Sequence, residues 1–153
     1  MSDQFFTVKI SGLSEIQKKL EAMPQKVAKR AIRTALRKAS IVVRDKIVSF
    51  APWKTGFLAE HFNIKIRAFR NYLAAVSHIG PNSKVYYPAN PNAGKRGGKR
   101  KSMPVIAVAQ FNEFGTVKMP AQPFVRPAFA ATRDKALEII TDELRKAIEA
   151  ATK

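Results

Sequence analysis

Residues able to carry out nucleophilic, acid–base or metal chemistry are scarce in this sequence. Cysteine is absent, which excludes disulfides, a thiolate nucleophile and a thiolate-bound metal. The two histidines, His61 and His78, have no second metal-type ligand at a recognised spacing, so we expect no zinc site. Glu60 precedes His61, but neighbours in a strand point to opposite faces and cannot form an acid–base pair. Only Glu60 and Glu113 lie outside the expected helices and the N-terminal tail, so the sequence predicts neither an enzyme nor a cofactor site.

The sequence is strongly basic. The chain carries 28 Lys and Arg against 11 Asp and Glu, a formal net charge of +17. Between Glu60 and Glu113 there is no acidic residue, but there are nine basic ones. A field of one sign favours a polyanion or an acidic protein as the partner. The alternative is a soluble basic surface with no specific target.

The densest cationic cluster falls in a long loop expected over residues 80–104. Five of the eight residues 94–101 are basic, on a glycine-rich backbone that could follow phosphates. No aromatic residue is interleaved to stack on bases. We leave two interpretations open, a contact with DNA or an acidic partner, and a solvated surface loop. The basic residues of this loop are Lys95, Arg96, Lys99, Arg100 and Lys101.

A second cationic group lies along the longest expected helix, residues 24–50. Pro24 suits a first turn, and Pro52 ends the helix at the preceding residue. Apolar residues recur on one side at helical spacing, and basic residues fall on the other side at spacings of four, three and four. This basic stripe consists of Lys26, Arg30, Arg33 and Arg37. It could line DNA or face an acidic neighbour, but the pattern alone favours the solvent face of a helix that packs on a core.

Alternating and helical periodicities predict an α+β fold. We expect an antiparallel sheet of about four strands, packed on one face by the 24–50 helix and by a C-terminal helix beginning near Ala128. The expected strands include residues 6–10 and a hairpin of residues 57–67 and 72–79. Residues 105–111 alternate weakly and could form a strand or a short helix. A short helix is expected around Ile16 and Leu20.

Three short strings are the most specific features of the chain. They are residues 51–58, 113–116 and 120–128. Gly56 and Gly115 supply turn conformations that side chains disfavour. Prolines stiffen an arm over residues 119–127 and exclude it from a central strand. Phe124 in an extended arm would have little of its own domain to bury against, so it could anchor in a neighbouring subunit. In the alternative, the arm packs back onto its own helices.

Taken in order, these strings resemble the tail-completion, or head–tail joining, proteins of long-tailed double-stranded DNA bacteriophages. That family's pattern runs from Gly-Leu through a proline and a basic helix to Ala-Pro, Thr-Gly-x-Leu, Glu-Phe-Gly-Thr and Pro-Phe-x-Arg-Pro-Ala, and it covers nearly the whole chain. The residues that carry the last four motifs are Ala51, Pro52, Thr55, Gly56, Leu58, Glu113, Phe114, Gly115, Thr116, Pro123, Phe124, Arg126, Pro127 and Ala128. Two features depart from the pattern. Residues 59–61 replace the family's basic residue and serine, and the basic loop is longer than the family's.

The resemblance implies a non-enzymatic virion protein that assembles, in the host cytoplasm, into a ring expected to be sixfold. The ring would complete the tail and bind the head connector or stopper on one side and the tail terminator or tail tube on the other. Packaged DNA is a further candidate partner. The alternatives are a nucleic-acid-binding module acting through its basic surface, and a minor component elsewhere in the tail. At 153 residues we expect one domain, residues 1–153, and we find no run near the ~20 apolar residues of a membrane span.

Overall fold

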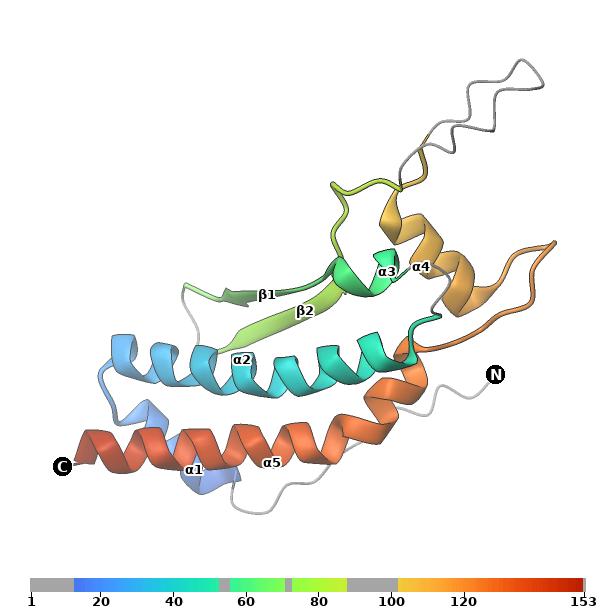
Figure 1. The fold of residues 1–153 in the computed structure, drawn as a ribbon. Coiled ribbons are helices and arrows are strands. Elements are labelled where there is room, and N and C mark those ends of the chain that lie inside the picture. Colours follow the sequence, from blue (N-terminus) through green and yellow to red (C-terminus); the bar gives the residue numbers. More distant parts are fainter. Residues whose placement is uncertain (1–12, 53–55, 71–72, 88–101, 153) are drawn as a thin grey trace.

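The computed structural model describes residues 13–52, 56–70, 73–87 and 102–152 (Figure 1). In chain order the elements are α1 (Leu13–Glu21), α2 (Gln25–Phe50), α3 (Phe57–Glu60), β1 (Phe62–Ala68), β2 (Ala75–Pro81), α4 (Val105–Phe114) and α5 (Val125–Thr152). Two long helices and a strand pair in one chain confirm the α+β class. No described helix combines the length and the apolar character needed to cross a membrane.

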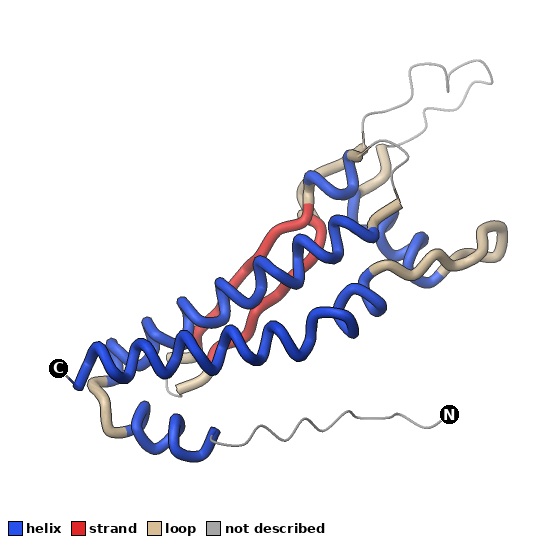
Figure 2. The backbone as a smooth tube through the Cα atoms, turned by 60° about the horizontal axis from the view of Figure 1, so that its bottom comes forward, coloured by secondary structure: helices blue, strands red, loops and turns tan. Residues whose placement is uncertain are grey.

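Helix α2 is the central element of the fold. It begins after Pro24, whose φ is −53°, and ends at Phe50 because Ala51 adopts extended backbone before Pro52. Its buried stripe is rich in alanine, which lets neighbouring elements approach closely. The buried residues are Ala28, Ala31, Ala35, Ala39, Ser40, Val43 and Ile47. Against this stripe lie the two strands on one side and α5 on the other (Figures 1 and 2).

The expected packing of both long helices on one face of the sheet is wrong. Figure 1 shows α2 between the sheet and α5, so α5 packs on α2 along most of its length. A two-stranded sheet explains the difference, because strands ~5 Å apart leave room for one helix ~10 Å across. Near the start of α5, Phe124 meets the strands. Its ring lies edge-on to that of Phe62, with centroids 6.0 Å apart.

The sheet has two strands in the described residues, not about four. β1 and β2 are antiparallel, with Phe62 opposite Pro81 and Ala68 opposite Ala75. The expected strand over 57–67 begins instead with the helical turn α3, and residues 105–111 belong to the helix α4. The expected strand at residues 6–10 lies outside the described residues.

Two clusters of buried side chains hold these layers together. The larger joins the C-terminal half of α2 to Leu58, Phe62, Val105 and Phe124. The smaller joins α1 to the opposite end of the α2–α5 pair through Ile16, Leu20, Ala28 and Ile148. The short helix expected around Ile16 and Leu20 is therefore present, and its apolar residues are buried.

Candidate functional site

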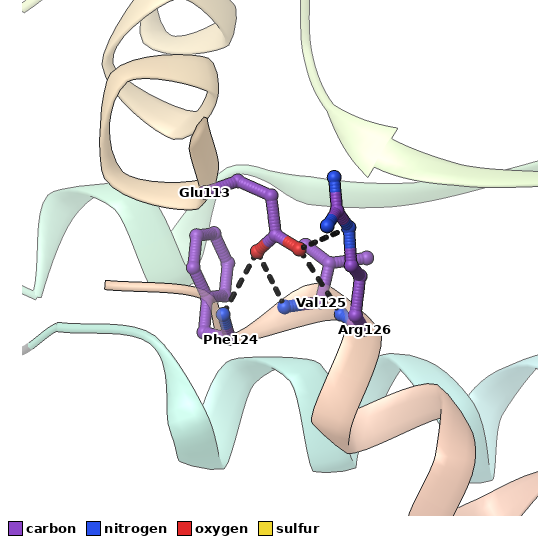
Figure 3. A network of polar contacts seen from close by, with 4 residues as sticks. All are labelled: Glu113, Phe124, Val125 and Arg126. Carbon is purple, nitrogen blue, oxygen red and sulfur yellow. Dashed lines mark hydrogen bonds and ion pairs between the residues drawn. The ribbon is translucent and has the colours of Figure 1, made fainter. Parts of the chain in front are cut away.

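The strings 113–116 and 120–128 meet at the N-terminus of α5 (Figure 3). Oε2 of Glu113 accepts hydrogen bonds from the backbone N–H groups of Phe124 at 2.8 Å and Val125 at 2.9 Å. Oε1 accepts one from the N–H of Arg126 at 3.2 Å and lies 3.6 Å from that residue's Nε. One carboxylate on α4 thus accepts three consecutive backbone N–H groups at the start of α5. We call this arrangement the Glu113 cap.

The Glu113 cap satisfies groups that a helix cannot satisfy by itself. The first N–H groups of a helix lack intrahelical partners, and the helix dipole places partial positive charge there. Pro127 completes the first turn of α5 and has no N–H, so it adds no unpaired donor. Hydrogen bonds to a charged acceptor contribute about 1.5–3 kcal/mol each. The Glu-Phe-Gly-Thr and Pro-Phe-x-Arg-Pro-Ala strings therefore lock α4 to α5.

The carboxyl of Glu113 is only 7% exposed, yet it is held in its charged form. Burial raises its pKa, because the charged form loses solvation. The N–H groups of Val125, Phe124 and Arg126, together with the Arg126 charge, lower the pKa by more. The net result is a pKa below the ordinary value of 4.5. At neutral pH the cap is ionised.

Gly115 makes the sharp exit from α4 that brings the two strings together. Its φ is +77°, and a Cβ built on it would lie 2.8 Å from the backbone nitrogen of Ala121 and 3.0 Å from the carbonyl oxygen of Met119. Thr116 and Met119 exchange two backbone hydrogen bonds, of 2.8 and 3.2 Å, and so close a tight turn. At the tip of this 116–119 turn, Val117 is fully exposed.

The interpretation of Phe124 as an anchor for a neighbouring subunit is wrong. Its side chain is 1% exposed and belongs to the main core of its own chain. The arm therefore packs against α4 and α5 of its own chain, which is the alternative interpretation of the sequence. The physical reason is the Glu113 cap, because the bonded N–H of Phe124 fixes the backbone from which the ring enters the core.

The described residues of the 51–58 string are 51–52 and 56–58. Gly56, with φ of +68°, precedes α3, and Leu58 is buried in the main core. Thr55 lies outside the described residues. The Phe57 ring lies 4.3 Å from the ring of His61, centroid to centroid, and Nδ1 of that histidine lies 2.7 Å from the Phe57 carbonyl oxygen. Among the described residues no three His, Asp or Glu side chains are grouped as a metal site would need.

Of the two cationic groups, the basic loop and the basic stripe, the structure describes only the stripe. Lys95, Arg96, Lys99, Arg100 and Lys101 all lie outside the described residues. The stripe is described: Lys26, Arg30, Arg33 and Arg37 are exposed on α2. Together with Lys29, Thr34 and Ala68 at the end of β1, they line a groove of about 580 Å³, which we call the basic groove.

The sequence reading missed an exposed apolar surface on and around α4, the α4 surface. Seven of its ten residues are apolar and they are spread around the helix, a pattern typical of a buried helix. Yet its large side chains reach solvent: Ile106 is 37% exposed, Phe111 39% and Phe114 63%. A hollow of about 250 Å³, the α4 hollow, lies between α4 and the end of β2. Its lining includes Ile79, Gly80, Pro81, Ile106, Gln110 and Phe114. The signal was the unbroken apolar run from Val105 to Ala109, which is unusual in a helix that faces solvent.

Comparison with known proteins gives one match. No curated protein and no solved structure matches the chain. One family model matches residues 14–115, more than half of the chain, and it is described as "Bacteriophage HK97-gp10, putative tail-component". The match includes Glu113 and Gly115 but ends before Phe124, so the acceptor of the Glu113 cap lies inside it and the donors lie outside. The chain belongs to the HK97-gp10-like family of bacteriophage tail components.

Proposed function

We propose that this tail component is a non-enzymatic subunit of a ring that completes the tail and joins it to the head. The observation that carries the proposal is the α4 surface, with the 116–119 turn projecting beside it. Soluble monomers rarely leave an apolar patch of this kind uncovered unless a partner covers it. A second copy of the same chain is the occupant that we propose.

A ring requires two different surfaces on each subunit, because each copy contacts the next one head to tail. This chain offers such a pair. Val117 projects on a turn braced by Gly115, and the α4 hollow is lined mostly by apolar residues, with Gln110, Glu113 and Arg126 as its polar ones. We propose that Val117 of one subunit enters the α4 hollow of the next. Closure of the ring would bury Phe114 and Ile106, which a monomer leaves exposed.

The motif order supports a position at the head-proximal end of the tail, in a sixfold ring. There the ring would bind the head connector or stopper on one side and the tail terminator or tail tube on the other. The Glu113 cap makes the subunit rigid at the edge that would be buried, since it fixes α4, the 116–119 turn and α5 relative to one another. Rigid surfaces lose less entropy on assembly.

Removing the protein from infected cells tests the position. We expect filled heads and separate tails of full length that do not join, seen by electron microscopy of the lysate. Absence of tails, or tails of altered length, would contradict the proposal and favour the second candidate, a component acting elsewhere in the tail.

A charge placed on the projecting turn tests the surface. Val117→Asp alters a side chain that its own fold leaves fully exposed, so the monomer should keep its stability while head–tail joining is lost. The matched control is Val27→Asp, a 42% exposed valine on α2 that should tolerate the same change. Normal infectious yield from Val117→Asp would contradict the proposed contact.

A further inference from the structure

We infer that the basic groove binds the phosphate backbone of double-stranded DNA. The groove lies between α2 and the end of β1, away from the Glu113 cap, and five of its seven lining residues are cationic. No described residue that lines it is acidic. This inference does not depend on ring formation, because a single chain contains the whole groove.

The cations form a linear array on a straight element. Lys26, Arg30, Arg33 and Arg37 fall on one face of α2, and at 1.5 Å per residue they span about 17 Å. One strand of duplex DNA presents a phosphate about every 3.4 Å along its axis, so about five phosphates lie within that span. Arginine also pairs with phosphate through two parallel hydrogen bonds, which a simple point charge does not provide.

The N-terminus of α2 lacks the negative charge that a helix favours there. Its first turn contains no acidic residue, and no side chain caps it. Instead Lys26, Lys29 and Arg30 add positive charge to the positive end of the helix dipole. At the N-terminus of α5, by contrast, the Glu113 carboxylate supplies the negative charge. A bound phosphate backbone would supply the missing anion at α2.

Two of the three cations elsewhere on α2 pair with an acid, and the third, Lys46, lies over the ring of Phe50. Lys38 bonds Glu143 of α5 at 2.6 Å, and Arg44 bonds Asp45 at the same distance. In the groove, the contact recorded for Lys29 is with a backbone carbonyl, that of Arg70, and not with an acid. Acidic partners thus offset the charge of Lys38 and Arg44, whereas no ion pair with an acid is recorded for the five cations of the groove.

The composition of the groove favours DNA over an acidic protein. Protein interfaces usually have an apolar centre surrounded by polar groups. Here Ala68 and Thr34 are the uncharged residues of the lining, so a protein partner would find no apolar anchor among them. The lining also carries no aromatic ring on which an unpaired base could stack, so the contact should be with phosphates and independent of sequence.

The test is the salt dependence of DNA binding by the full chain, measured with a labelled 30-base-pair duplex by fluorescence anisotropy. The groove variant carries Lys26→Gln, Arg30→Gln, Arg33→Gln and Arg37→Gln. The control variant carries Lys18→Gln, Lys118→Gln, Lys135→Gln and Arg145→Gln, all exposed and all outside the groove. Each variant lowers the net charge from +17 to +13, and glutamine keeps helix propensity close to that of Lys and Arg.

We expect log affinity to fall linearly with log salt for the wild-type chain, and the slope to be smaller by about 3–4 units in the groove variant. The control variant should change the slope by less than one unit. Equal slopes for the two variants, or no DNA binding by the wild-type chain, would overturn the inference. Binding of poly-glutamate in place of DNA, lost in the groove variant, would also overturn it in favour of an acidic protein partner.

The basic loop needs its own variant, since it could also bind phosphates. Replacing Lys95, Arg96, Lys99, Arg100 and Lys101 by Ser removes it as a source of charge. If the groove binds DNA, the loop variant still binds DNA with a salt-dependent affinity. Adding the four groove substitutions to the loop variant should then reduce the slope of log affinity against log salt. If the loop variant abolishes the salt-dependent binding altogether, the groove is not the site.

Discussion

The carboxylate of Glu113 accepts the backbone N–H of Phe124 at 2.8 Å, across eleven residues of chain that contain the 116–119 turn. This bond ties the last turn of α4 to the first turn of α5. It also sets the position of the Phe124 ring in the main core. The spacing of two sequence motifs is thus explained by one capping interaction.

Loss of the Glu113 cap should destabilise the fold. Glu113→Ala leaves three N–H groups at a buried helix end without their acceptor, and we expect about 3 kcal/mol less unfolding free energy in urea titrations. Glu113→Gln keeps one acceptor oxygen and should lose about half as much. Glu143→Gln is the control, because that carboxylate pairs with Lys38 at the surface. A Glu113→Ala protein as stable as this control would contradict the role of the cap.

The cap should also make stability depend on pH. Since the pKa of Glu113 is lowered in the folded chain, the folded state binds fewer protons than the unfolded state in the range between the two pKa values. Its stabilising contribution is complete above about pH 5 and is lost as pH falls through the lowered pKa. The difference in unfolding free energy between wild type and Glu113→Gln should therefore shrink between pH 7 and pH 3. A difference constant over this range would show that ionisation of Glu113 is not involved.

Two glycines should respond in opposite ways to the same substitution. Gly115→Ala places a Cβ 2.8 Å from the backbone nitrogen of Ala121 at a φ of +77°, so we expect a loss of about 1–3 kcal/mol. Gly80→Ala meets no atom within 4 Å and should leave stability unchanged or raise it by a few tenths of a kcal/mol. Thermal denaturation of both variants checks the contrast. Equal melting temperatures would mean that the exit from α4 can relax.

Phe124 should behave as a core residue in mutagenesis. Phe124→Ala removes a ring that is 1% exposed, which typically costs about 3–5 kcal/mol. Phe129→Ala, on α5 five residues further along the chain and 54% exposed, should cost far less. Chemical denaturation of the isolated subunits compares the two. If Phe124→Ala folded normally but failed to assemble, the anchor interpretation rejected above would be restored.

The long helices could be predicted from sequence because their signals are local. Proline at residues 24 and 52 delimits α2, and the apolar spacing of α2 and α5 repeats over many turns. The residues of α3 were assigned to the strand because Phe57 and Leu58 are apolar and shortly precede the alternating residues of β1. Gly56, in the left-handed region, starts a helical turn there instead. Helix α4 was ambiguous because an all-apolar run has no period to measure.

The Glu113 cap and the α4 surface depend on tertiary structure. Local rules look for a cap within four residues of a helix start, whereas Glu113 lies eleven residues before Phe124. The resemblance placed both residues among the family motifs without indicating that they touch. Phe114 is exposed because no other element of the chain covers it, and this depends on where α5 and the sheet lie in the fold. The basic stripe was read correctly as exposed, but its groove depends on where β1 ends.

The most direct test of the ring is a disulfide between neighbouring subunits. The chain has no cysteine, so Val117→Cys with Gly80→Cys introduces the only two thiols, one on the projecting turn and one in the α4 hollow. Both positions can accept the side chain, because Val117 is fully exposed and a Cβ on Gly80 meets nothing within 4 Å. The measurement is a non-reducing gel of oxidised virions, with each single-cysteine variant as control. We predict a ladder of cross-linked species that ends at the ring, expected at six subunits, and no ladder in the controls. Uncross-linked monomer in the double-cysteine virions, or a ladder with no end, would contradict it.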